Sequence, residues 1–264
     1  MSRYRRGLFC RYNRQDPFPT PHDKMNDPAP ELQPSVSQIV ADALISAADG
    51  LSRWLEHPIH TQQLGTTQVD LDAAKASLAD PGDMLCCCCM PVELAGSPKD
   101  LAELCEPTSS DSVSVPAGRL LLAWDLPDAM WLIDRSLNET GTSEDQSTWG
   151  SLQWSAIAET SNVVGCEFLN AIAEGIQDIS KADLLLLPDP PRITQETADS
   201  LIDNAITDVE PSHNGAADRK IWMATGTFQV ADHPIHTRMA MVWCPLVWQR
   251  LVTLVNGSSN GGKG

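Results

Sequence analysis

Two stretches of this chain read RLLLAWDLPDAMWLIDRSLN (residues 119–138) and RMAMVWCPLVWQRLVTLVN (residues 238–256). Each contains an arginine, four mostly apolar residues, a tryptophan, a proline soon afterwards, a second tryptophan and a final asparagine. A short apolar run is typical of a buried strand, and a proline suits the first turn of a helix, where its missing N–H costs nothing. Both stretches therefore predict a buried strand followed directly by an amphipathic helix.

The repetition extends upstream of these two stretches. Residues 41–57 and residues 158–174 both place apolar side chains at helical spacing, and the two segments align with a constant shift. Residues 84–94 and residues 221–230 are further strand candidates, each preceding one of the strand–proline–helix stretches. A repeated order of long helix, strands and short helix predicts that the two halves of the chain pair their strands in one sheet.

The sequence therefore predicts an α+β fold with one mixed sheet and two long helices on one face. We expect one domain over residues 36–256, made of two pseudo-repeats at about residues 36–138 and 150–256. Residues 1–35 are rich in proline and poor in apolar residues, which predicts a disordered tail. The glycine-rich residues 257–264 predict a second, flexible tail.

The charge of the chain argues against some classes of partner. Its 264 residues carry 18 Lys and Arg against 35 Asp and Glu, a formal net charge of −17. Nucleic-acid binding draws its affinity from clustered positive charge, so we expect no nucleic-acid partner. Anionic membranes are disfavoured for the same reason, and no apolar run is long enough to span a bilayer.

Four of the eight cysteines, Cys86–Cys89, are consecutive. Neighbouring residues of a strand point to opposite faces, so this run is poorly arranged to bind one tetrahedral zinc ion. We expect a strand buried on both faces, in which free cysteine packs as a small apolar residue. The pairs His57/His60 and His233/His236 have the spacing of metal ligands, but the sequence supplies no third ligand, so we assign no metal site. Reduced thiols and the lack of a signal-peptide pattern predict a cytoplasmic protein.

The second of the two long helices carries a polar stripe. Ser155, Glu159 and Asn162 lie at positions i, i+4 and i+7, which places them on one side of a helix. The aligned residues of the first copy are Gln38, Asp42 and Ile45. The first copy thus keeps an acid but has an apolar side chain where the amide would stand. A stripe of this kind is most often only the solvated face of a helix.

Two small residues beside the stripe add to its interest. Ser161 and Gly165 are poor helix formers, each costing about 0.5–1 kcal/mol relative to alanine. We interpret them as leaving the helix backbone open to close approach by a large group.

With this stripe the chain resembles the CheC, CheX and FliY phosphatases of bacterial chemotaxis. Their signature is an Asp or Ser, a Glu four residues on, an Asn three residues further, and a later Pro. Ser155, Glu159, Asn162 and Pro188 match it within SAIAETSNVVGCEFLNAIAEG and LLLLPDPPRI. The resemblance covers roughly residues 36–256 and includes the duplication. The gap between Asn162 and Pro188 exceeds the family's usual spacing, and the first copy lacks the amide, so the chain resembles a single-site member.

The resemblance implies that this protein hydrolyses the aspartyl phosphate of a CheY-like response regulator. Asn162 would orient the attacking water, because a carboxamide accepts and donates hydrogen bonds without titrating. Glu159 would dock the partner by pairing with its active-site lysine, and Ser155 and Pro188 would contact the partner. No cofactor is expected on this chain, because the phosphate and the Mg²⁺ ion would be bound by the response regulator.

Other functions stay open. The same scaffold without catalysis would be an interaction module in chemotaxis or flagellar signalling. The missing amide of the first copy and the altered proline spacing favour that alternative. An enzyme that uses thiols or zinc is a third class. An activator protein and a homodimer, formed through the edge strands of the sheet, are further partners that the sequence leaves undecided.

Overall fold

The computed structural model describes residues 36–80, 82–97, 101, 114–138, 149–209, 221–230 and 233–257. The helices and strands, in chain order, are α1 (Val36–Leu55), β1 (Ile59–Val69), α2 (Leu71–Leu78), β2 (Met84–Gly96), β3 (Ser114–Asp125), α4 (Leu126–Leu137), α5 (Ser151–Ser180), β4 (Leu184–Pro188), β5 (Arg192–Thr197), α6 (Ala198–Val209), β6 (Ile221–Val230), β7 (His233–Trp243) and α7 (Pro245–Gly257). The two strand–proline–helix stretches predicted from the sequence are β3–α4 and β7–α7. Both predicted long helices, α1 and α5, are present and begin earlier than the aligned segments.

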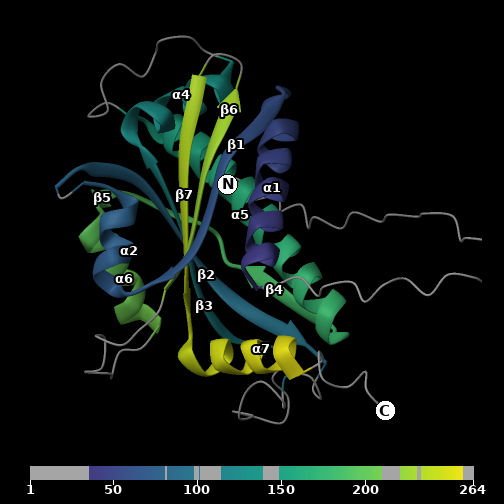
Figure 1. Cartoon of the computed structure of the whole chain (residues 1–264). Coiled ribbons are helices and arrows are strands. Elements are labelled where there is room, and N and C mark those ends of the chain that lie inside the picture. The colour runs from purple at the N-terminus through teal and green to yellow at the C-terminus, as the bar shows by residue number, and fades with distance from the viewer. Residues whose placement is uncertain are drawn as a thin grey trace, which may run out of the picture. The chain divides into compact units, whose positions relative to one another are not determined.

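The described strands form one seven-stranded sheet in the order β1–β6–β7–β3–β2–β4, and β5 also pairs with β2. The order of elements in the first half of the chain recurs in the second half, where β4 and β5 together take the place of β1. The first strand of each half pairs with the second strand of the other half: β1 lies beside β6, and β4 and β5 lie beside β2 (Figure 1). The two halves are therefore joined by exchanged strands.

The pairing of β3 with β7 at the centre of the sheet is symmetric about a two-fold axis. Arg119 and Arg238 are equivalent in the two sequence repeats, and the same equivalence relates Leu121 to Ala240. Leu121 faces Ala240 across the ladder between β3 and β7. An axis through this pair, perpendicular to the sheet, makes the central strands antiparallel. All described pairings are antiparallel, so the expectation of a mixed sheet was wrong in this respect.

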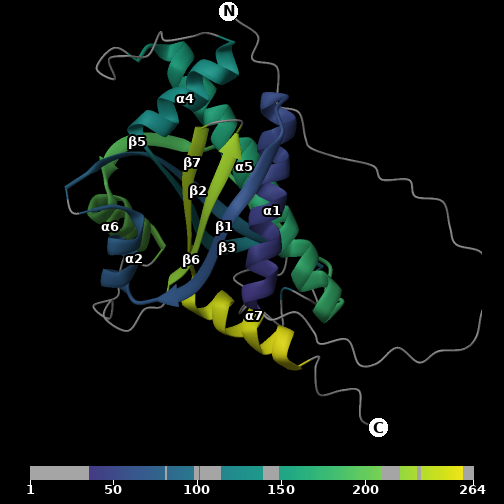
Figure 2. The same ribbon diagram turned by 45° about the horizontal axis from the view of Figure 1, so that its top comes forward.

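Helices cover both faces of the sheet (Figures 1 and 2). As predicted, the two long helices, α1 and α5, lie side by side on one face, while α2 and α6 lie on the other. The larger hydrophobic core lies between the sheet and α1, α4, α5 and α7, and a smaller core lies under α2 and α6. The inner side of the 30-residue helix α5 is filled by the larger core. Only its outer side is available to a partner.

The cysteine-rich strand β2 is buried on both faces, as the sequence predicted. Cys86 and Cys88 face the larger core, and Cys87 faces the smaller one. Burial raises the pKa of Cys86 to about 12, and it also raises the pKa of Cys87 and Cys88. These thiols stay protonated at neutral pH and serve as packing groups.

Residues 1–35 and 258–264, where the sequence predicts tails, lie outside the described residues, and the domain boundaries remain a prediction. No helix in the described part of the chain combines the length and the apolar character needed to cross a lipid bilayer.

Candidate functional site

One side of α5 is fixed to α1 by polar contacts. Trp54 Nε1 donates a hydrogen bond to Thr160 Oγ1 at 3.2 Å. Arg53 Nη2 lies 2.6 Å from Glu167 Oε1 and forms an ion pair with it. Thr160 and Glu167 are seven residues apart, so they mark the side of α5 that faces α1.

The predicted stripe lies on another side of α5, turned away from α1. Ser155 and Glu159 are exposed, and Asn162 is half-buried. The three residues span two helical turns, which is about 10 Å along the axis. The structure thus puts two of the three predicted side chains fully on the surface and the amide partly there.

The carboxamide of Asn162 is contacted from one turn further along α5. Cys166 Sγ donates a hydrogen bond to Asn162 Oδ1 at 3.6 Å. A thiol is a weak donor, and a carbonyl oxygen has two lone pairs, so this contact leaves Oδ1 able to accept a second hydrogen bond. The NH₂ group adds two donors at the same place. The amide can therefore hold a small polar molecule, such as water, at the helix surface.

The two small residues near the stripe face the sheet instead of a partner. Ser161 and Gly165 are both buried, and Ser161 Oγ donates to the Ile157 carbonyl at 2.6 Å. A Cβ atom on Gly165 would collide with the end of the Met90 side chain on β2. The large group that approaches the backbone here is Met90 of the protein's own core, so the interpretation of these residues as an opening for a partner was wrong.

Pro188 lies at some distance from the stripe. It ends β4, where it is half-buried and opposite Val92 of β2. The side chain of Ser161 on α5 reaches Cys88 of β2, whose partner on the edge strand is Ile193. Val92 is four residues from Cys88, so Pro188 lies about 13 Å along the sheet from the level of Ser161. A partner-binding role for Pro188 remains a prediction.

The matching positions of α1 are also exposed. Gln38 Nε2 donates to Asp42 Oδ1 at 2.8 Å, and Ile45 is 42% exposed. Ile45 stands where α5 has Asn162, and an aliphatic side chain cannot orient a water molecule. The first half of the chain therefore presents the stripe without its amide.

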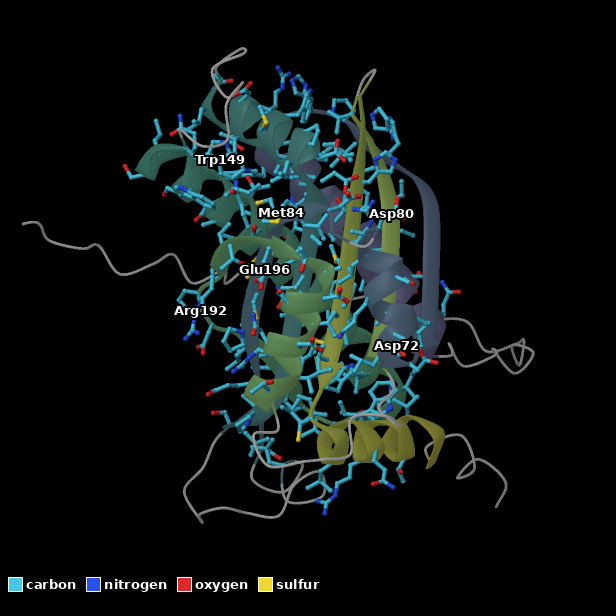
Figure 3. The ribbon with its side chains drawn as sticks, turned by 90° about the vertical axis from the view of Figure 1, so that its left-hand side faces the viewer. Asp72, Asp80, Met84, Trp149, Arg192 and Glu196 are labelled. Carbon is cyan, nitrogen blue, oxygen red and sulfur yellow. The ribbon has the colours of Figure 1, made fainter. Side chains whose placement is uncertain are left out.

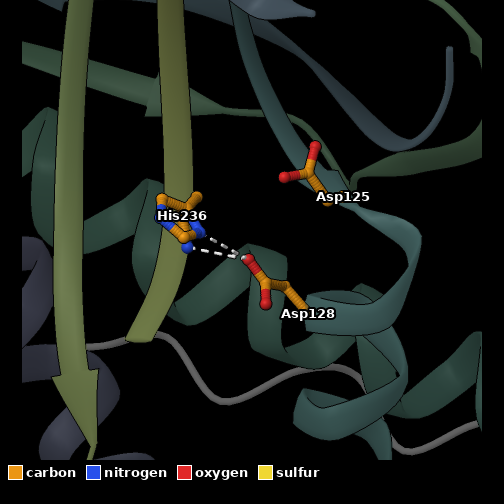
Figure 4. Close-up of side chains that lie close together, drawn as sticks. All are labelled: Asp125, Asp128 and His236. Atoms are coloured by element: carbon orange, nitrogen blue, oxygen red, sulfur yellow. Dashed lines mark hydrogen bonds and ion pairs between the residues drawn. The ribbon is translucent and has the colours of Figure 1, made fainter. Parts of the chain in front are cut away.

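Three side chains with metal-ligand chemistry, which sequence reasoning did not bring together, meet at the start of α4 (Figure 4). Asp125, Asp128 and His236 are the one such group among the described residues, with ligand atoms within 4.8 Å of one another. Arg238 donates to both oxygens of Asp125, at 2.7 and 3.2 Å. The backbone N–H of His236 donates to Asp128 Oδ2 at 2.8 Å. Asp128 is buried, so we infer that these contacts fasten β7 to the β3–α4 junction.

A hollow of about 240 Å³ lies between α2 and α6, on the opposite face of the sheet. Its lining includes Asp72, Asp80 and Asp199, of which Figure 3 labels the first two. Lys75, also in the lining, pairs with Asp203 at 2.7 Å. The sheet separates this hollow from α5, so it is not part of the stripe.

No protein-family model matches this sequence, and no curated protein matches it. Among solved structures, the chain is similar to Thermotoga maritima FliY, with 14% sequence identity, a TM-score of 0.52, and coverage of 86% of this chain and 99% of that one. Two weaker likenesses are the FliM middle domain from H. pylori (11% identity, TM-score 0.45, 81% of this chain and 92% of that one) and CheX in a complex with CheY, BeF₃ and Mg²⁺ from Borrelia burgdorferi (12% identity, TM-score 0.37, 76% and 96%).

The fold assignment rests on FliY. At this level of identity the likeness establishes the fold alone. The chain has the fold of FliY, and the resemblance to the CheC, CheX and FliY group that its sequence predicts is confirmed in three dimensions.

Proposed function

We propose that this protein hydrolyses the aspartyl phosphate of a CheY-like response regulator. The observation that carries the proposal is the outer side of α5, where Ser155 and Glu159 are exposed and the half-buried amide of Asn162 can still accept a hydrogen bond. The FliY-like fold supports it, because it supplies the long surface helix on which the resemblance places the site. A cytoplasmic location, where the buried thiols stay reduced, belongs to the same proposal.

Asn162 acts by orienting water. An O–H of the water donates to Oδ1 of Asn162, and the water oxygen is thereby held in line with the phosphorus atom of the partner's aspartyl phosphate. A bond forms between the water oxygen and phosphorus while the bond from phosphorus to the aspartate oxygen breaks. The products are a free aspartate carboxylate and inorganic phosphate, and the water proton passes to phosphate or solvent. The partner binds the Mg²⁺ ion that balances the phosphoryl charge.

Glu159 lies one turn before Asn162 and acts by docking. Its side chain is exposed. A carboxylate at this position pairs with a lysine of the response regulator, which brings the phosphorylated aspartate over the amide. Ser155 lies one further turn away and contacts the edge of the partner.

The test is dephosphorylation of a purified, phosphorylated CheY-like receiver by the wild-type protein, by Asn162→Ala and by Asn170→Ala. Asn170 is an exposed amide on the same helix, so its variant is a matched control. Loss of a preorganised water-orienting group costs about 10²–10³ in rate, so we expect that loss for Asn162→Ala and a wild-type rate for Asn170→Ala.

A wild-type protein that does not accelerate dephosphorylation contradicts the proposal, as does an Asn162→Ala variant with an unchanged rate. Binding of the phosphorylated receiver without hydrolysis would instead assign the chain to the non-catalytic interaction modules. The aliphatic Ile45 at the matching position of α1 is what favours this second candidate.

A further inference from the structure

The charge of α5 is entirely of one sign. Its 30 residues include Glu159, Glu167, Glu174 and Asp178 and contain no Lys, Arg or His. Glu167 is paired with Arg53 of α1. The other three acids lie at positions that are exposed. A surface of this kind attracts a partner whose contacting face is basic, and it accelerates the encounter most at low ionic strength.

An exposed apolar side chain lies at the beginning of the same surface. Leu152 is 56% exposed, the largest value among the large hydrophobic side chains of the described residues. It lies three residues before Ser155 and seven before Glu159, so helical geometry puts it on the side of α5 that carries the stripe. Leucine at an exposed helix position contributes no core packing, whereas its burial by a partner is favourable.

We propose that a docking strip for the response regulator extends from Glu159, whose contact to a lysine belongs to the proposed function, to Leu152, which is its apolar anchor. The proposal rests on the proposed function and adds to it the chemistry of the partner surface: a lysine or arginine flanked, about 10 Å away, by an apolar side chain. Burying a leucine that is about half exposed predicts a five- to ten-fold effect on affinity.

The experiment measures binding of a CheY-like receiver loaded with Mg²⁺ and beryllofluoride, so that no hydrolysis is needed. Leu152→Ala is compared with Leu246→Ala, because both leucines are the second residue of a helix and Leu246 on α7 is 43% exposed. We expect the Kd to rise five- to ten-fold for Leu152→Ala and to stay at the wild-type value for Leu246→Ala. Raising the salt from 0.05 to about 0.3 M is expected to slow association of the wild type more than that of Glu159→Gln.

The proposal is overturned if the two leucine variants bind alike, if Glu159→Gln keeps the full salt dependence, or if the wild type binds no receiver of a panel. Failure of the proposed function has a different signature. In that case the receiver binds and Leu152→Ala weakens the binding, but neither the wild type nor any variant releases phosphate. Conversely, if Asn162→Ala loses hydrolysis and Leu152→Ala leaves binding unchanged, the catalytic proposal stands without the docking strip.

Discussion

Replacement of Gly118 by alanine is expected to destabilise the centre of the sheet. Gly118 lies on β3 opposite Trp243 of β7, with a backbone φ of 157°. A Cβ atom there would collide with the Val242 carbonyl oxygen and would lie 3.0 Å from Cα of Trp243. All of these neighbours are backbone atoms of the adjacent strand, so no side-chain rotation can relieve the contact.

The expected cost has two parts. Overpacking of a well-filled site costs about 1–3 kcal/mol. A non-glycine residue with this backbone conformation costs a further 1–3 kcal/mol or so. Together they predict a loss of about 4 kcal/mol, which is a large share of the roughly 5–15 kcal/mol by which a domain is stable. The strands must separate locally, and this weakens the hydrogen bond from Cys244 N to Ala117 O, now 2.8 Å long.

Urea unfolding, followed by circular dichroism, measures this cost against a control. Gly82 has a φ of 90°, but a Cβ atom there meets nothing within 4 Å. Gly82→Ala should therefore show the conformational cost alone, about 1–3 kcal/mol, and Gly118→Ala should lose clearly more. Equal losses in the two variants would refute the argument, because the collision with β7 would then contribute nothing.

Three further predictions concern the buried thiols of β2 and the ion pair of Asp125 and Arg238. The buried thiols of Cys86–Cys88 should resist alkylation at pH 8 in the folded protein and react fully in denaturant, as counted by mass spectrometry; rapid reaction of the native protein would contradict their burial. Folding raises the pKa of Cys86 from 9.0 to about 12, so the folded state holds this proton more tightly than the unfolded state does. The free energy of unfolding should therefore be unaffected below pH 9 and should fall between pH 9 and about 12. The expected fall is about 1 kcal/mol per pH unit for each such thiol. A flat profile in urea titrations across that range would be inconsistent with this. For the pair of Asp125 and Arg238, both partly exposed, a double-mutant cycle with alanine should give a coupling of about 1 kcal/mol that shrinks in 1 M salt, and a coupling of zero would show that the bidentate contact adds no stability.

Much of the architecture could be predicted from the sequence, because the signals are local. The proline that opens α4 and the one that opens α7 mark the same junction twice, and apolar spacing gives the length of a helix whatever its neighbours. The pairing of strands is not local. Alternating burial says which face a side chain takes but not which strand lies beside it. The exchange of first strands and the antiparallel centre therefore had to come from the structure.

The candidate site divides in the same way. The spacing of Ser155, Glu159 and Asn162 fixes a common side of a helix, and that prediction needs no tertiary contact. The small size of a residue does not indicate which side of a helix it faces, so the sequence could not show that Gly165 packs against Met90 of the core. No sequence pattern singles out Leu152, the most exposed leucine of α5, because a single apolar residue near a helix start is ordinary in a sequence.

The contact between Asp125 and Arg238 has no local signal in the sequence. The two residues are far apart in the chain, and they meet only because Ala123 of β3 faces Arg238 of β7.

The exchange of first strands means that neither half of the chain is a closed body. β1 is held chiefly by β6 from the other half, and β4 and β5 by β2, so each half alone would leave a gap in its own sheet. The molecule is equivalent to two interlocked protomers tied together by a single covalent link. Severing that link after Asn138 would not release two small domains; it would turn folding into an encounter between fragments, with a rate set by their concentration.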